Sequence, residues 1–166
     1  MGQKNHTIKL SVSELFFDAQ NKAYLNVRGT DAATQQAAYM RLTEDEPESE
    51  QFYRSLSTAI AECVEALYPY TKMLCEDNGE TSNAISRDSE YEVSLAFNDT
   101  LSKTTMTLIT NLMHDYIVYR ALADWFDLTA PGGGIAWHSR ADAAMEQMRI
   151  RLHARCGRVR RTLSPF

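Results

Sequence analysis

The stretch that decides the fold reads LSKTTMTLITNLMHDYIVYRALADWF, residues 101–126, and it runs into the turn DLTAPGGG, residues 127–134. Its expected inward positions recur every three or four residues, which is the spacing of one helix face. These positions are Leu101, Thr105, Leu108, Leu112, Tyr116, Tyr119, Ala123 and Phe126. A second set widens the stripe, namely Ile109, Met113, Ile117 and Trp125. We therefore expect a long helix that is capped by Asp99 or Thr100 and buried on more than one side.

Further helices are expected on both sides of this stretch. The helix after the glycine turn runs from Ile135 to Cys156, with Gly157 as its stop. Its expected inner face is Trp137, Ala141, Ala144, Met145, Met148 and Leu152. A helix from Pro47 to Leu67 carries one apolar stripe, formed by Phe52, Leu56, Ala59, Ile60, Cys63, Val64 and Leu67. Residues 13–29 also have helical spacing, and the Ala-rich stretch 31–42 is either a helix or part of a mobile arm.

Two runs alternate apolar and polar residues, as half-buried strands do. They are residues 7–12 and residues 90–97. With the short apolar piece 71–75 they predict a small antiparallel sheet. The expected fold class is α+β, mainly α: a bundle of three to four helices with a small antiparallel β-sheet. We expect one domain over 1–157, with an exposed acidic loop at 43–50 and a polar loop at 77–89, followed by a basic tail at 158–166.

Charge is unevenly distributed along the 166 residues, whose formal net charge is −5 from 17 basic and 22 acidic residues. No acidic residue follows Glu146, whereas six arginines lie between Arg149 and the end of the chain. Residues 1–148 therefore hold 11 basic and 22 acidic side chains, a net charge of −11, against +6 for the last eighteen residues. Segments of opposite sign indicate head-to-tail docking or an anionic partner. The acidic body argues against a general nucleic-acid binder.

Cysteine usage and hydropathy indicate a reducing, aqueous compartment. The three cysteines, Cys63, Cys75 and Cys156, form no CxxC spacing, so neither a disulfide framework nor a zinc site is expected. The first residues contain no apolar signal-peptide core, and no apolar run approaches the roughly 18 residues of a membrane span. We therefore expect a cytoplasmic protein with no membrane partner.

For each motif that could support catalysis, a structural role is favoured over a catalytic one. The three glycines at 132–134 lack the preceding strand and the following Lys-Ser/Thr of a phosphate-binding loop, which favours a helix–helix connector. His114, His138 and His153 have no second histidine at helical spacing, so surface or structural roles are favoured. The aromatic residues around the turn favour core packing, with a ligand cage as the alternative. We expect no enzyme activity, no cofactor, no metal and no small-molecule substrate.

One segment resembles a known class of protein. Met113–Phe126, the Gly-rich turn, the Ala-rich run Ser139–Glu146 and the Arg-rich end together resemble the small neck proteins of tailed phages, the head–tail connectors or adaptors, over about residues 113–161. The segment is also similar to hypothetical prophage proteins of gut bacteria. The resemblance implies a non-enzymatic ring subunit, commonly dodecameric, that docks portal to tail. It implies a place in the virion after assembly in the host cytoplasm, with DNA passing through the channel.

The basic tail is the candidate partner-binding segment. Gly157 ends the last helix, three arginines then concentrate positive charge, and two apolar residues follow as anchors. The predicted partner-binding residues are Arg158, Arg160, Arg161, Leu163 and Phe166. The alternatives are a disordered end and a contact with DNA phosphates. For the whole chain, the alternatives to a connector are a small cytoplasmic adaptor or regulatory protein that binds one partner protein, and an enzyme with an unrecognised pocket.

Overall fold

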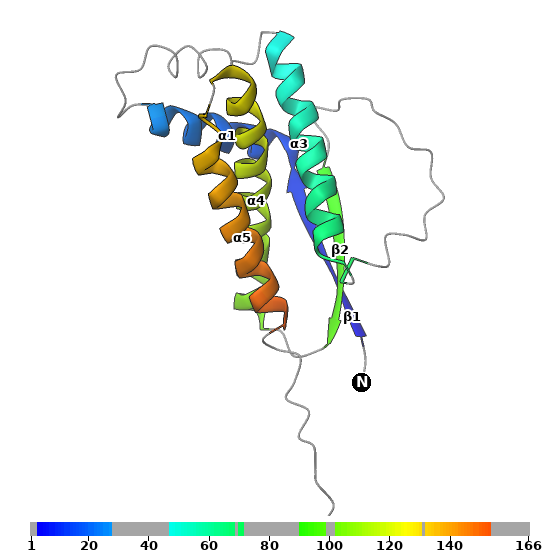
Figure 1. The fold of residues 1–166 in the computed structure, drawn as a ribbon. Helices are drawn as coiled ribbons and strands as arrows, with labels where there is room; N and C mark the ends of the chain where they lie inside the picture. The colour runs from blue at the N-terminus through cyan, green and yellow to red at the C-terminus, as the bar shows by residue number, and fades with distance from the viewer. Residues whose placement is uncertain are drawn as a thin grey trace, which may run out of the picture.

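Six regular elements make up the described part of this computed structural model, which covers residues 3–27, 47–68, 70–71, 90–98, 102–130 and 132–153. The elements follow the chain in the order strand, two helices, strand, two helices (Figure 1). They are β1 (Gln3–Ser11), α1 (Val12–Val27), α3 (Pro47–Ala66), β2 (Glu90–Asn98), α4 (Lys103–Thr129) and α5 (Ile135–His153). The chain is therefore mainly helical with a small antiparallel sheet, which confirms the predicted fold class.

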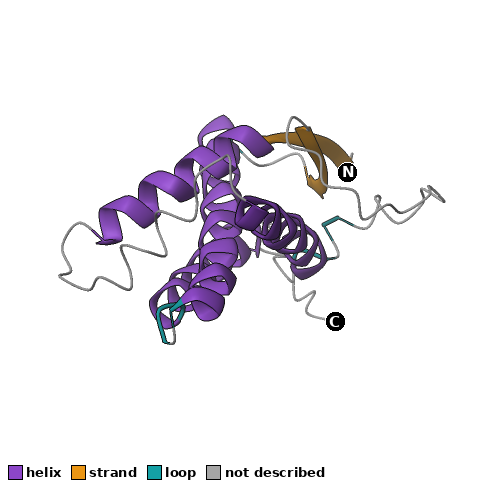
Figure 2. Cartoon of the chain, turned by 90° about the horizontal axis from the view of Figure 1, so that it is seen from above, coloured by secondary structure: helices purple, strands orange, loops and turns teal. Residues whose placement is uncertain are grey.

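Helix α4 is the centre of the fold, since it packs against α5, α3 and α1. Helices α3, α4 and α5 run side by side, whereas α1 lies across them (Figure 1). Seen from above, α1 reaches outward on the side of the bundle away from the two strands (Figure 2). The buried residues of α4 are Ile109, Met113, Tyr116, Ile117, Val118, Ala121, Leu122, Ala123, Trp125 and Phe126. They surround more than half of the helix, which confirms burial on more than one side.

The first part of α4 differs from the prediction. Its N-cap is Ser102, whose side chain accepts a hydrogen bond from the Thr105 backbone N–H at 3.2 Å, and the predicted cap residues lie outside the described residues. Leu108 is 38% exposed and Leu112 is half-buried, while Ile109 and Met113 are fully buried. Two adjacent stripes, one through Leu108 and one through Ile109, both have helical spacing in this part of α4. The packing of α3 and α1 on α4 selects the one that contains Ile109.

The sheet has two described strands, and every residue of β1 is paired with β2 from Gln3↔Asn98 to Ser11↔Glu90. One face is buried in the core and holds Ile8, Leu10, Val93 and Leu95. Strand β1 starts earlier than the predicted residue 7, because pairing with β2 extends it through polar residues that show no alternation. Val12 belongs to α1 rather than to the strand. Of the predicted third strand 71–75, Thr71 lies in a turn and the rest lies outside the described residues.

Other predicted boundaries are met in part. Pro47 is the first residue of α3, as a first-turn proline should be, so 47–50 are helical and Ser49 is buried where an exposed loop was expected. The predicted segments 31–42 and 77–89 lie outside the described residues. All six residues of the predicted inner face of α5 are buried, and the helix is described as far as His153. No helix in the described part of the chain is both long and apolar enough to cross a lipid bilayer.

Candidate functional site

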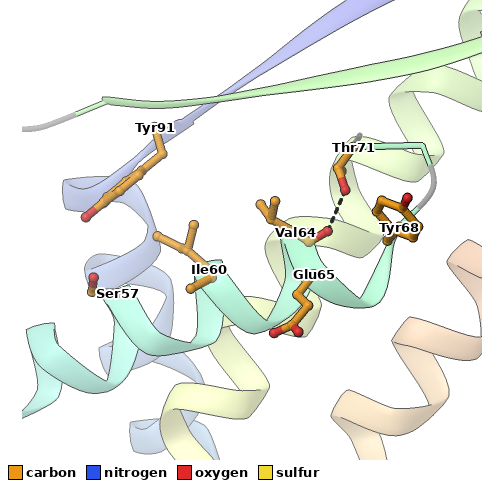
Figure 3. A pocket seen from close by; sticks show the side chains of 8 residues that line it. Ser57, Ile60, Val64, Glu65, Tyr68, Thr71 and Tyr91 are labelled. Atoms are coloured by element: carbon orange, nitrogen blue, oxygen red, sulfur yellow. Dashed lines mark hydrogen bonds between the residues drawn. The ribbon is translucent and has the colours of Figure 1, made fainter. Parts of the chain in front are cut away.

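A groove between α3 and β2 is the candidate functional site. Its volume is about 800 Å³ (Figure 3). Its lining consists of Ser57, Ile60, Ala61, Val64, Glu65, Tyr68, Thr71 and Tyr91. Most of this lining is apolar, and only Ile60 and Thr71 are buried. A surface of this kind suits an extended segment of polypeptide whose apolar side chains need cover.

The groove exists because one face of α3 packs against the helical bundle, whereas the adjacent face of α3 points toward the sheet. Phe52, Leu56, Ala59 and Cys63 are buried in the core, whereas Val64 is only half-buried. In Figure 3, Ile60 and Val64 point from α3 toward the strands, and Tyr91 extends from the strand side toward Ser57. The helix therefore supplies the floor and one wall of the groove, and β2 supplies the other wall.

The chain that leaves α3 fixes one end of the groove. The Thr71 hydroxyl donates to the Val64 carbonyl at 2.8 Å. The Ala96 backbone N–H of β2 donates to the Tyr70 carbonyl, also at 2.8 Å. These two bonds attach the same short segment to the helix and to the sheet. The walls are therefore held at a set distance from each other.

A second polar feature joins α3, α4 and α5 through Arg120. Its Nε donates to Glu62 Oε2 at 2.7 Å, and its Nη1 donates to Asp124 Oδ1 at 2.6 Å. Nη1 also lies 3.3 Å from His138 Nδ1, and His138 Nε2 lies 2.8 Å from Asp127 Oδ2. Since a guanidinium can only donate, His138 accepts at Nδ1 and donates from Nε2. These bonds connect five side chains into one network that ties three helices together.

Burial and charge shift the pKa values around this network. The hydrogen bond that Arg120 donates to Glu62 raises the pKa of Arg120, so the guanidinium stays charged. Burial raises the pKa of Asp124, and the charge of Arg120 opposes that effect. Burial also raises the pKa of Tyr116 to about 12 and that of Cys63 to about 12. The Cys63 thiol is therefore protonated at neutral pH and a poor nucleophile.

A third polar region lies between α1 and α4. His114 Nε2 is 2.8 Å from Asp18 Oδ2, and Lys22 Nζ pairs with Asp115. The two pairs bond adjacent residues of α4 to residues one turn apart on α1. Asp18, His114 and Asp115 border a polar cavity of about 410 Å³ that also contacts Lys9 of β1. The arrangement fixes α1 across α4 and gives His114 a structural partner.

The described residues that were predicted as candidate sites do not line the groove. Arg158, Arg160, Arg161, Leu163 and Phe166 lie outside the described residues. The three histidines His114, His138 and His153 each have a different partner: Asp18, Asp127 with Arg120, and Tyr70. Within the described ranges no group of three or more His, Cys, Asp or Glu residues could hold a metal ion.

The aromatic residues near the glycine turn pack against each other in the interior. The rings of Phe126 and Trp137 stack with centroids 6.1 Å apart, and Tyr119 lies 5.8 Å from Trp137. Trp137 and Phe126 are 2% and 1% exposed. Of the two interpretations left open by the sequence, this geometry matches core packing.

The groove was missed by reasoning from the sequence, because Ile60 is buried as the predicted stripe requires, and the stripe does not show that Val64 stays half-buried beside open space. The available signal was the polar and small character of Ser57, Ala61 and Glu65, which leaves that side of the stripe thin. Comparison of the chain with protein-family models, curated proteins and solved structures found no match.

Proposed function

We propose that this chain is a non-enzymatic structural subunit of a phage or prophage virion, a head–tail connector ring component that docks portal to tail. The observation that carries the proposal is a pair of separate apolar surfaces. One is the groove between α3 and β2. The other is the outer face of α1, where Phe17 and Leu25 are 61% and 64% exposed.

A ring subunit needs two different surfaces, because each copy contacts one neighbour through one surface and the next neighbour through the other. The two apolar surfaces described here meet that need. Helix α1 reaches outward on the side away from β2, so the two surfaces belong to elements in different parts of the molecule (Figures 1 and 2). The resemblance of residues 113–161 to phage neck proteins supplies the virion context and the location in the virion.

The polar clusters support a structural rather than a catalytic role. Arg120 is bonded to two carboxylates and to His138, and His114 is bonded to Asp18. The bonds from Arg120 to Glu62 and His138, and from His114 to Asp18, join different helices, whereas Asp124 lies on the same helix as Arg120. A role in holding the helices together accounts for these side chains without a reaction.

The alternative is a small cytoplasmic adaptor or regulatory protein that binds one partner protein. The observation that favours it is again the groove, because a single extended peptide from another protein would fill it without any ring. In that case the exposed face of α1 has no role in self-assembly.

Mass in solution separates the two functions. We would measure the mass of the full chain by light scattering and native mass spectrometry over a wide range of concentration. A closed assembly of many copies supports the connector, and Phe17→Ser with Leu25→Ser should reduce it to smaller species. A monomer or dimer at every concentration contradicts the connector and favours the adaptor. As a matched control, Ile150→Ser changes an apolar residue that is 46% exposed on α5 and should leave the mass unchanged.

A further inference from the structure

His138 lies in the first turn of α5 and is bonded at both of its ring nitrogens. Its Nδ1 accepts a hydrogen bond from Arg120 Nη1 at 3.3 Å, and its Nε2 donates to Asp127 Oδ2 at 2.8 Å. The Nδ1 atom has no proton in this arrangement, because a guanidinium has only N–H donors to offer. The ring is therefore neutral in the structure, with its one proton on Nε2.

Protonation affects the two bonds of this ring in opposite ways. The charged imidazolium has an N–H group at both Nδ1 and Nε2. The bond to Asp127 then becomes charge-assisted and is kept. The bond from Arg120 is lost, because two N–H donors face each other and both groups are positively charged.

The surroundings of the ring can accept the added charge. The His138 side chain is 40% exposed, so water reaches the ring. The charged groups on the surrounding elements are Arg120, Asp124 and Asp127 on α4, Glu62 and Arg54 on α3, and Asp142 one turn further along α5. The carboxylates outnumber the guanidiniums, which leaves a surplus of negative charge while the ring is neutral. Since histidine ordinarily changes charge between about pH 5 and 8, a proton can be taken up here at the expense of the Arg120 bond.

The bond from Arg120 also connects this turn of α5 to α3. Arg120 lies on α4, and its Nε donates to Glu62 of α3 at 2.7 Å, so Glu62, Arg120 and His138 form a chain of bonds across three helices. A different bond, from Arg149 Nη2 to the Ala66 carbonyl at 3.3 Å, connects the other half of α5 to the end of α3. Loss of the bond between Arg120 and His138 therefore separates only the first turn of α5 from α3.

The partners of two other histidines are compatible with a charged ring. His114 Nε2 lies 2.8 Å from the Asp18 carboxylate, which can only accept, so a charged His114 keeps this partner. His153 Nδ1 lies 3.1 Å from the Tyr70 hydroxyl, which can accept as well as donate. His138 differs from both, because one of its partners is a cation.

From these observations we propose that His138 is a pH-sensitive switch between α5 and α3. Protonation of its ring breaks the bond from Arg120, keeps the bond to Asp127, and releases the first turn of α5 from α3. The inference goes beyond the proposed function. It concerns bonds within one chain, so it holds whether the chain is a ring subunit or an adaptor.

Side-chain signals in nuclear magnetic resonance test the state of the ring directly. In the isotope-labelled full chain at about pH 8, we expect a proton on His138 Nε2 and none on Nδ1. As the pH falls to about 5, Nδ1 should gain a proton, and the Arg120 side-chain N–H signals should shift with the same midpoint. Arg140, whose Cζ lies 4.7 Å from the centre of the Trp137 ring, is the matched control and should not follow. A proton on Nδ1 at the higher pH, or Arg120 signals that stay constant while the ring titrates, would overturn the inference.

Double-mutant cycles test the energetic consequence of the switch. His138→Ala and Arg120→Gln, alone and together, give the coupling between the two side chains from denaturant unfolding. At about pH 8 we expect this coupling to favour folding by roughly twofold to fivefold in the equilibrium constant, and at about pH 5 to vanish or to oppose folding. The matched control is the pair His114→Ala and Asp18→Asn, whose coupling should be at least as favourable at the lower pH. Equal coupling of Arg120 and His138 at both pH values would contradict the switch.

The titration of Asp124 has to be separated from that of His138. Asp124 also accepts from Arg120, and burial raises its pKa. Asp124→Asn keeps an oxygen acceptor beside Arg120 but cannot titrate. Repeated in this variant, both experiments should give the same response to pH. A response that disappears in Asp124→Asn would assign the switch to Asp124 and overturn the role of His138.

Discussion

The interface between α4 and α5 and the interface between α3 and β2 are built from similar residues but are filled to different degrees. Between α4 and α5, the ring of Trp137 lies against Tyr119 and Phe126, and the space is filled. Between α3 and β2, a groove with a volume of about 800 Å³ stays open among the described residues. Close packing in the helical hairpin therefore stabilises the fold, whereas the α3–β2 side leaves apolar surface partly exposed.

The largest effect should come from emptying the filled interface. Trp137→Ala removes the ring that Tyr119 and Phe126 contact, and we expect unfolding to become easier by about 3–5 kcal/mol. Denaturant titration followed by circular dichroism measures the change, and Trp137→Phe should recover much of it. A loss below about 1 kcal/mol would show that the α4–α5 interface is not the stable region.

The turn between the same helices should be nearly as sensitive. A Cβ on Gly134 would lie 2.6 Å from the Ala123 carbonyl oxygen and 2.1 Å from the Asp127 carboxylate, so we expect Gly134→Ala to cost about 1–3 kcal/mol. Gly132 has φ +78° and open space around it, so Gly132→Ala should cost about 1–2 kcal/mol from backbone strain alone.

A double variant separates the two causes at the turn. Asp127→Ala removes the closer of the two contacts, so it should relieve part of the cost of Gly134→Ala and none of the cost of Gly132→Ala. Equal relief at both glycines would contradict the steric explanation. Thermal or denaturant unfolding of Asp127→Ala alone, the two single glycine variants and the two double variants supplies the comparison.

The network at Arg120 should make stability depend on pH in a defined direction. Burial raises the pKa of Asp124 above its ordinary 3.8, so the folded form holds this proton more tightly than the unfolded form. The stabilisation from this group is complete below that ordinary pKa and is lost as the pH rises through the raised value. Asp124→Asn cannot titrate and should flatten this part of the profile in denaturant titrations at acidic pH. Parallel profiles for the two proteins would contradict the raised pKa.

The smallest effect is expected in the groove. Ala61→Arg adds a large side chain at an exposed position, and the free energy of unfolding should stay within about 0.5 kcal/mol of the wild type. The same change at Ala144, which is 6% exposed on the inner face of α5, should be strongly destabilising. Similar losses at both alanines would show that the groove is filled and would remove the contrast between the two regions.

How well the buried face of a helix could be predicted from the sequence depended on how many elements pack against that helix. Helix α5 packs mainly on α4, so its single stripe from Trp137 to Leu152 was identified completely. Helix α4 has neighbours on several sides, and of the two stripes predicted for it the one through Ile109 is buried, whereas Leu108 in the other is 38% exposed. Local spacing cannot decide between adjacent stripes when several partners compete for one helix.

The candidate site could not be predicted from local spacing, because it depends on contacts between residues that are far apart in the sequence. The bond between Glu62 and Arg120 joins residues 58 positions apart, and the bond between Thr71 and Val64 matters only because β2 lies beside it. Isoleucine and valine, the residue types at Ile60 and Val64, suit a core position as well as the floor of an open groove. Only the placement of β2 against α3 separates the two.

The pairing of β1 with β2 determines an order of events during synthesis of the chain. Ser11 pairs with Glu90 and Gln3 with Asn98, so the first strand has no partner until the ribosome has made nearly a hundred residues. Closing a loop of that length carries a larger entropic cost than closing the short turn at Gly132, which joins α4 to α5. Contacts close in sequence form faster than distant ones. The helical hairpin therefore assembles as a local unit, whereas the sheet has to join the start of the chain to a strand near its middle.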